Sequence, residues 1–296
     1  MNTINKILLS ITAISISLSL FIYSTKEPTK NTSESYQIKA LKIPNNISFC
    51  GEIAPLYKPD VRERIDRELL VNTYWQSNAL LLIKRSNKYF PIIEPILKKN
   101  GVPNDFKYLA VIESGLQNVT SSAGAKGFWQ LMPHTAKEYG LEVNSNVDER
   151  YHIEKATEAA CKYLLKSKEK FGTWTLAAAA YNAGNRGISR YQEKQKVTDY
   201  YDLLLNTETK RYIPRVLALK EILSHPQQYG FIYDQEDLYN LNKTKLVKVD
   251  TAISNIAIFS KQMNCNYKEL KINNPWLKEN KLNNKSRKVY YIKIPE

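Results

Sequence analysis

Residues 106–115 read FKYLAVIESG, and they predict a short helix that carries a carboxylate near its end. At about 100° per residue, Phe106, Leu109 and Ala110 share one helical face with Glu113. The glycine that follows is typical of a helix C-terminus. The stretch therefore places one acidic side chain on an apolar stripe, in the last helical turn.

The surroundings of Glu113 predict a carboxyl group that holds its proton near neutral pH. Partial burial disfavours the ionised form, and the negative end of the helix dipole acts in the same direction. Together they should raise the pKa of Glu113 from about 4.3 towards roughly 6–7, the range of a general acid. The alternative is a surface glutamate that merely ends a helix, and the motifs that follow favour the catalytic interpretation.

Two further segments carry polar and aromatic residues that favour a binding site. Residues 121–133 read SSAGAKGFWQLMP, in which small residues precede Trp129 and Gln130 and predict a tight loop beside a cleft. Residues 180–184 read AYNAG, which places Tyr181 and Asn182 at the end of a helix.

The order and spacing of these ES, GxWQ and AYN segments resemble the soluble-lytic-transglycosylase family. GFWQLMP and the later YGL resemble its membrane-bound lytic murein transglycosylase D branch, over about residues 60–235. The resemblance implies a goose-lysozyme-like α fold with Glu113 as catalytic acid and base. It implies peptidoglycan contacts by other side chains, namely Ser114, Gln130, Tyr181, Asn182, Tyr212 and, as a face for sugar stacking, Trp129. Tyr212 would orient the carboxylate, or else fill an ordinary core position.

The implied reaction is cleavage of the MurNAc-GlcNAc bond without water, in which the muramic 6-hydroxyl attacks its own ring and leaves a 1,6-anhydro end. Ordinary glycosidases use two carboxylates, and we find no second acid in a comparable motif near Glu113. Two alternatives stay open. Water could replace the 6-hydroxyl in a lysozyme-like hydrolase, or the chain could be an inactive wall-binding scaffold.

The net charge of +14 does not by itself indicate nucleic-acid binding. Lysines are spread along the whole chain beside abundant Asn and Ile, a pattern typical of biased genome composition rather than of a phosphate-binding patch. We therefore expect no nucleic-acid partner, although a basic surface would be attracted to an anionic polymer or membrane.

The N-terminal region has the composition of an export signal. Lys6 precedes an uncharged run from Ile7 to Tyr23, so residues 1–25 are predicted to be a signal peptide or a membrane anchor. Residues 26–59 are polar and proline-containing, which favours a linker. We expect a protein of the cell envelope or periplasm, which the N-terminal segment would anchor to the membrane if it is not cleaved.

The remaining chain predicts a mainly α protein: a lysozyme-like catalytic domain over 60–235, followed by a small β-α-α-β module over 240–296. The expected catalytic-domain helices cover 61–82, 92–97, 103–115, 133–139, 153–170, 174–182 and 208–223, with a kink at Pro214 or a start near Arg215. The module has expected strands at 245–250 and 289–294 and helices at 253–263 and 267–272. It resembles a degenerate lysin motif, whose role is either glycan binding or packing.

The cysteine and histidine patterns indicate neither a disulfide framework nor a metal site. Three cysteines leave at least one unpaired, with Cys161 expected to be buried and Cys50 and Cys265 able to pair in an oxidising compartment. The three histidines lie far apart without partners at ligand spacing. We expect no cofactor.

Overall fold

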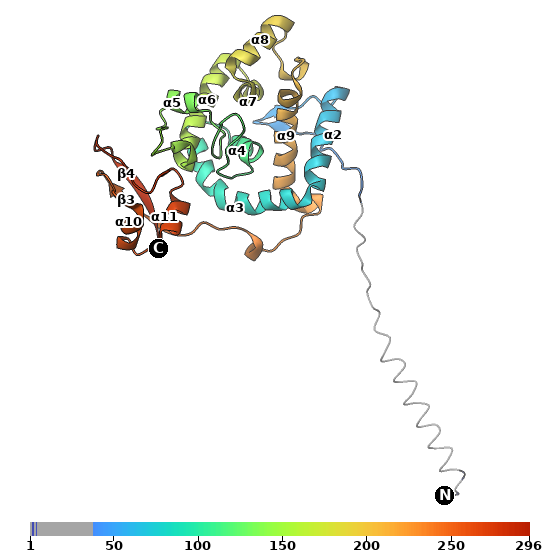
Figure 1. The fold of residues 1–296 in the computed structure, drawn as a ribbon. Helices are drawn as coiled ribbons and strands as arrows, with labels where there is room; N and C mark the ends of the chain where they lie inside the picture. The colour runs from blue at the N-terminus through green and yellow to red at the C-terminus, as the bar shows by residue number, and fades with distance from the viewer. Residues whose placement is uncertain (1, 3, 5–37) are drawn as a thin grey trace. The chain divides into compact units, whose positions relative to one another are not determined.

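The computed structural model describes residues 2, 4 and 38–296, and its fold is mainly helical (Figure 1). Leu41–Glu296 form one compact unit. The α-helices of its larger part are α2 Pro59–Tyr74, α3 Gln76–Lys99, α4 Lys107–Ser114, α5 Pro133–Glu138, α6 Ile153–Phe171, α7 Trp174–Ala183, α8 Asn185–Gln195 and α9 Thr207–Ser224. The prediction of a mainly α chain is confirmed.

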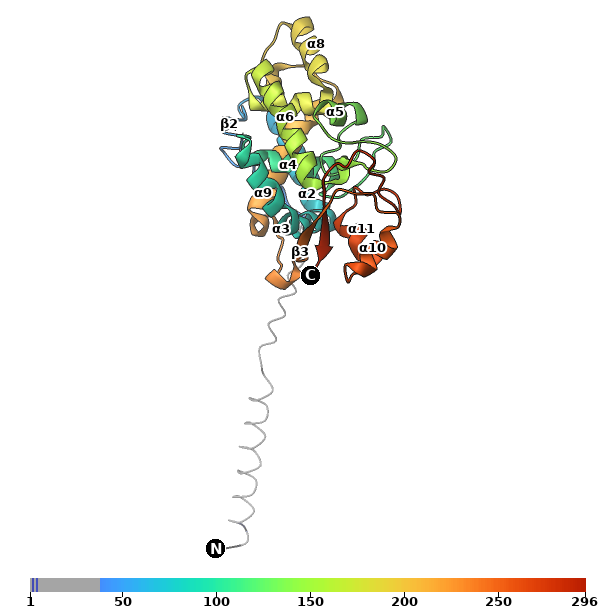
Figure 2. The same ribbon diagram turned by 90° about the vertical axis from the view of Figure 1, so that its left-hand side faces the viewer.

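The C-terminal module has the predicted β-α-α-β order, in β3 Thr244–Val249, α10 Ile256–Gln262, α11 Tyr267–Asn273 and β4 Tyr290–Pro295. Its strands pair antiparallel, with Thr244 opposite Pro295 and Val249 opposite Tyr290, and its helices lie together beside them (Figure 2). Helix α10 begins three residues later than Ile253, the predicted start. The reason is the Asn255 side chain, which caps the helix by accepting hydrogen bonds from the N–H groups of Ala257 and Ile258.

A break at Trp75 separates α2 from α3, where the spacing predicts a single helix over 61–82. Trp75 has φ −85° and ψ 61°, outside the helical region, and its side chain is 61% exposed rather than in the core. The prediction of a separate helix at 92–97 is also wrong, since α3 continues through Pro91 and Pro95. Burial of Ile93 and Leu97 in the core favours the continuous helix despite the missing backbone donors.

Helix α4 lies in the middle of the helical part (Figure 1). It packs against α3 and α9 and buries Leu109 and Ala110 completely. A 3₁₀ turn, η1 Asn104–Phe106, precedes it, so the α-helix begins later than Pro103. Gly115 ends α4 at φ +59°, and its N–H donates to Val111 O over 2.9 Å. This geometry places Glu113 in the last turn, next to α9.

The predicted helices at 153–170, 174–182 and 208–223 are confirmed within one or two residues by α6, α7 and α9. The small side chains of residues 177–180 are fully buried and let α7 approach α6 and α9 closely. Helix α9 begins at Thr207, capped by Asn206, and contains Pro214, so a start near Arg215 is wrong. Helix α8 was not predicted, because its sequence is polar and only Ile188 in it is buried.

Part of the range predicted to be a linker, residues 26–59, packs against the helices. A short hairpin of β1 Ser48–Phe49 and β2 Glu52–Ile53 puts Phe49 fully in the core, edge-to-face with Phe106 at 5.0 Å. The predicted signal or anchor, residues 1–25, lies outside the described residues except at positions 2 and 4. No helix in the described part of the chain is both long and apolar enough to cross a bilayer.

Candidate active site

Glu113 is a half-buried carboxyl group whose surroundings favour its protonated form. Its pKa is raised to about 7, mainly by burial. A hydrogen bond from Tyr212 and the charge of Arg215 act to lower this pKa, and the charge of Glu208 acts to raise it. The direction and the size of this pKa shift agree with the expectation from the sequence, and its main cause is the removal of the carboxyl group from water. A carboxyl group with this pKa can both donate and accept a proton near neutral pH.

Tyr212 contacts this carboxyl group through its hydroxyl group. Its Oη donates to Glu113 Oε1 over 2.6 Å, although 99 positions separate the two residues. The Tyr212 side chain is only 3% exposed, and burial keeps its pKa well above the usual range, so its proton remains available for the hydrogen bond. Tyr212 is thus buried like a core residue and also makes the hydrogen bond that an orienting residue would make.

Helix α9 also places charged residues around the carboxyl group. Glu208, Tyr212 and Arg215 are spaced by four and three residues, so they share one face of the helix. Arg215 lies 3.5 Å from Glu68, a 1% exposed carboxylate on α2 that also accepts a hydrogen bond from Arg211 over 2.7 Å. The α2–α9 contact therefore holds in place the face that meets Glu113.

The loop over residues 119–131, here called the catalytic loop, is tied to α4 through Ser114. Ser114 Oγ lies within hydrogen-bond distance of the carbonyl oxygens of Ala110 (3.0 Å) and Phe128 (2.9 Å), and the side chain is buried. Gln130 adopts φ +44° and donates from Nε2 to Gly127 O and Val119 O. In this conformation the side-chain amide nitrogen of Gln130 is hydrogen-bonded within the loop, and its side-chain carbonyl oxygen is the group that can accept a hydrogen bond from a ligand.

Trp129 is a core residue. Its side chain has no exposed surface, and its indole Nε1 donates to Thr157 Oγ1 over 2.9 Å. This burial contradicts the expectation that Trp129 offers a face for sugar stacking, because both faces of the ring are covered by protein. Trp129 therefore lies in the loop as predicted, but its ring anchors the loop to the core and does not face a ligand.

Tyr181 and Asn182, at the end of α7, join the same set of contacts. Tyr181 Oη donates to the carbonyl oxygen of Trp129 over 2.7 Å, and burial, with the nearby Glu113 charge, raises its pKa well above the usual range. The Asn182 amide donates to Glu208 over 2.9 Å and accepts from Thr209 over 2.9 Å. Two hydrogen bonds join predicted site residues directly, Tyr212 to Glu113 and Tyr181 to Trp129, while Ser114, Gln130 and Asn182 bond to neighbouring residues of the same region.

Sequence reasoning missed the residues that hold the catalytic loop from behind. Arg150, 3% exposed, donates from Nη1 to Gly124 O over 3.0 Å and Leu131 O over 3.2 Å, while Nε and Nη2 make a bidentate pair with Asp148. A DER sequence in a polar stretch carries no signal for this role. Glu208 and Arg215, by contrast, could have been found from their helical spacing relative to Tyr212.

The described residues show no candidate metal centre. No group of three or more His, Cys, Asp or Glu in this part of the chain could hold a metal ion, and Cys50, Cys161 and Cys265 are free thiols.

Residues 90–204 match the family of the transglycosylase SLT domain. The chain carries an SLT domain. This match includes Glu113, the catalytic loop and Tyr181, and it confirms the predicted family resemblance and the lysozyme-like α fold. Residues 245–296 match the soluble lytic transglycosylase C-terminal LysM-like domain, so the module's predicted resemblance is also confirmed.

Parts of this chain are similar to known proteins. The membrane-bound lytic murein transglycosylase D of Escherichia coli K12 is 34% identical over 192 residues, which cover 62% of this chain and 42% of that protein. The chain thus spans less than half the length of this relative. The crystal structure of the 70 kDa soluble lytic transglycosylase of Escherichia coli aligns with 47% of this chain and 24% of its own, at a TM-score of 0.41 and 23% identity. The lytic transglycosylase Slt of Pseudomonas aeruginosa aligns with 51% of this chain and 26% of its own, at a TM-score of 0.38 and 21% identity.

Proposed function

We propose that this protein is a peptidoglycan lytic transglycosylase that uses Glu113 as its only catalytic acid and base. The observation that carries the proposal is the Tyr212–Glu113 hydrogen bond, within a site where burial raises the carboxyl pKa to about 7. Glu113 lies within residues 90–204, which match the SLT domain family, and this supports the substrate class, glycan strands of alternating N-acetylglucosamine and N-acetylmuramic acid.

The first chemical step cleaves the bond between the MurNAc anomeric carbon and the bridging oxygen. Protonated Glu113 donates its proton to that oxygen as the bond breaks, and the leaving sugar departs with a new hydroxyl group. The carbonyl oxygen of the substrate's own acetamide group stabilises the positive charge that develops at the anomeric carbon. Glu113 is left as a carboxylate, in which state Tyr212 continues to hold it by the same hydrogen bond.

The second step returns the proton and closes the product. The Glu113 carboxylate accepts the proton of the muramic 6-hydroxyl while that oxygen bonds to the anomeric carbon and displaces the acetamide oxygen. The 6-hydroxyl is tethered to the reacting ring, and this proximity favours it over water. The enzyme regains its protonated acid, and the product ends in 1,6-anhydro-N-acetylmuramic acid.

The other predicted contacts remain part of the proposal in modified form. Gln130 would accept from a sugar hydroxyl or amide through its carbonyl oxygen, while Ser114 and Tyr181 would act through the catalytic loop that they hold. Asn182 would act with Glu208, to which it donates a hydrogen bond. No cofactor takes part in these steps.

We place this activity in the cell envelope, where peptidoglycan lies. The predicted export segment over residues 1–25 and the similarity to a membrane-bound lytic murein transglycosylase support this location. An association with the membrane through the N-terminal segment would bring the SLT domain to the inner side of the wall.

The released product distinguishes transglycosylation from hydrolysis. Digestion of purified peptidoglycan by residues 26–296 should release fragments whose muramic ends are anhydro, lighter by one water than lysozyme products, as measured by mass spectrometry. A dominant product with reducing muramic ends, reducible by borohydride, would assign the protein to the hydrolases. No release at all, from protein shown to be folded, would support the inactive scaffold.

The Tyr212→Phe variant should show how the hydrogen bond tunes the acid. The bond lowers the pKa of Glu113, so its loss should raise that pKa further. Because the first step needs protonated Glu113, the alkaline limb of the kcat/KM profile should move to higher pH. The maximal kcat should fall by about tenfold, since the carboxyl group loses its fixed orientation. An alkaline limb at the parent's position would contradict this role for Tyr212.

A further inference from the structure

The C-terminal module is packed onto one segment of the helical part, residues 141–152, here called the docking segment. Val147 forms a β-bridge with Leu277, and both side chains belong to the module's own apolar core, as does that of Tyr151. The backbone N–H of Asp148 donates to Trp276 O over 2.9 Å. The docking segment therefore completes the module's apolar core, so the two parts share a fixed contact.

Asn146 adds directed polar bonds to this apolar contact. Its side chain is buried, donates to Lys281 O over 2.8 Å and accepts from the N–H of Asn283 over 2.8 Å. The backbone carbonyl of Asn146 accepts from the N–H of Lys278 over 2.9 Å. The Asn146 side chain thus donates to one backbone group of the module and accepts from another, and both bonds require a specific position of the docking segment.

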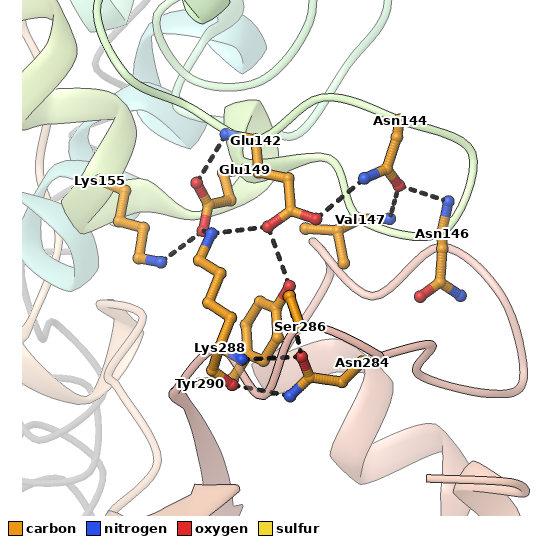
Figure 3. Close-up of polar contacts among 10 residues, drawn as sticks. All are labelled: Glu142, Asn144, Asn146, Val147, Glu149, Lys155, Asn284, Ser286, Lys288 and Tyr290. Atoms are coloured by element: carbon orange, nitrogen blue, oxygen red, sulfur yellow. Dashed lines mark hydrogen bonds and ion pairs between the residues drawn. The ribbon is translucent and has the colours of Figure 1, made fainter. Parts of the chain in front are cut away.

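A pair of neighbouring carboxylates on the segment is neutralised from the module (Figure 3). Glu142 accepts hydrogen bonds from Lys288 Nζ over 2.6 Å and Tyr290 Oη over 2.9 Å. Glu149, 2% exposed, accepts from the N–H of Glu142 over 2.8 Å and pairs with Lys155, with Lys288 3.6 Å away. Among the described residues, Lys288 is the cation that pairs with both carboxylates, whereas Lys155 pairs with Glu149 alone.

The far side of the docking segment holds the catalytic loop. Asp148, which meets the module through its backbone, orients Arg150, and Arg150 holds the carbonyl oxygens of Gly124 and Leu131. The backbone of Arg150 also lies directly against Gly127, where a Cβ atom would come within 1.9 Å of its carbonyl oxygen. The loop between these points contacts the residues around Glu113 through Ser114 and Tyr181.

We propose that the C-terminal module is a positioning element of the active site, in which Lys288 and Tyr290 hold the docking segment and Arg150 transmits its position to the catalytic loop. This inference rests on the proposed function only for its effect on turnover. It assigns the module a role that glycan binding alone does not require. The residues involved act through the loop and are positioning residues, since none of them contacts Glu113.

The test uses Glu142→Gln, Lys288→Met and the double variant of the full-length protein, with a soluble oligosaccharide of alternating GlcNAc and MurNAc as substrate. Each single variant should lower kcat by about tenfold with little change in KM, because the loop loses its position. The double variant should be no worse than either single one, since the two residues act as a pair. Lys285→Met removes one exposed charge from the same loop of the module and should match the parent.

Hydrogen exchange provides a readout that is independent of catalysis. Amides of residues 124–131 should exchange faster in Lys288→Met, and to a lesser degree in Tyr290→Phe, which keeps the ring stacked on Trp276 at 5.6 Å. Exchange in β3 and β4 should stay at the parent's rate, which shows that the module itself is folded. If the parent proves inactive while exchange responds as described, the positioning stands and the proposed function falls.

Two results would overturn the proposal. The first is parental exchange at 124–131 together with parental kcat in Lys288→Met and Tyr290→Phe. The second is a defect confined to KM or to binding of whole peptidoglycan, which would assign the module to substrate capture alone.

Discussion

Glu113→Gln should abolish turnover of peptidoglycan while the protein keeps its fold. The amide retains an acceptor oxygen for the hydrogen bond from Tyr212 and nearly the same shape, but it can neither donate nor accept the catalytic proton. General acid-base catalysis by a positioned side chain contributes about 100- to 10,000-fold, so kcat should fall by that factor. Release of muropeptides and the circular dichroism spectrum, measured on the same preparation, test both parts.

Glu138→Gln is the matched control for this variant. Glu138 is an exposed carboxylate on α5 that pairs with Lys166 at the surface, so its replacement removes the same charge without touching the site. It should retain the parent's turnover. Cleavage by Glu113→Gln within about tenfold of the parent would rule out Glu113 as the essential acid.

Gly127→Ala should disrupt the catalytic loop more than any other glycine substitution in it. Gly127 has φ +79°, where an L side chain costs about 1–2 kcal/mol. Its new Cβ would also lie 1.9 Å from Arg150 O, a backbone atom that cannot rotate away. The loop or the docking segment must therefore shift by more than an ångström, and a displacement of this size can lower kcat by about a hundredfold. Thermal unfolding and turnover measure the two effects.

Gly124→Ala separates backbone strain from steric clash. Gly124 lies in the same loop at φ +86°, but a Cβ there would meet no atom within 4 Å. It should therefore show the loss of stability from the positive φ and lack the additional loss that the clash causes in Gly127→Ala. Equal losses of stability and activity in the two variants would show that close packing against Arg150 has no role.

The helices of the larger, helical part were largely predictable, because an amphipathic helix leaves a local period of apolar residues in the sequence. The apolar spacing of α6, α7 and α9 is strong, and their predicted bounds agree with the structure. Failures occurred where local rules and packing disagree. Proline normally interrupts helices, yet α3 and α9 contain prolines that their buried faces outweigh. Helix α8 has almost no buried face, so it left no period to detect.

The candidate site was predictable to the extent that it lies in short motifs. The apolar face around Glu113 predicted the direction of its pKa shift, because burial of that face is written in the local sequence. The role of Trp129 was not predictable in this way. An aromatic next to an amide in a glycine-rich loop is compatible with either an exposed ring or an anchor, and only the position of Thr157 across the fold decides for the anchor.

The sequence by itself determined the mainly α class, the β-α-α-β order of the module and the placement of Glu113 at the end of an amphipathic helix, since each of these depends on residues within a few positions of one another. Tertiary structure alone decided which groups meet that carboxylate and what holds them. Tyr212 reaches Glu113 from 99 positions away, and Lys288 reaches Glu142 from 146 away. Contacts over such separations depend on how the helices pack and how the C-terminal module contacts the docking segment, and no local period in the sequence encodes them.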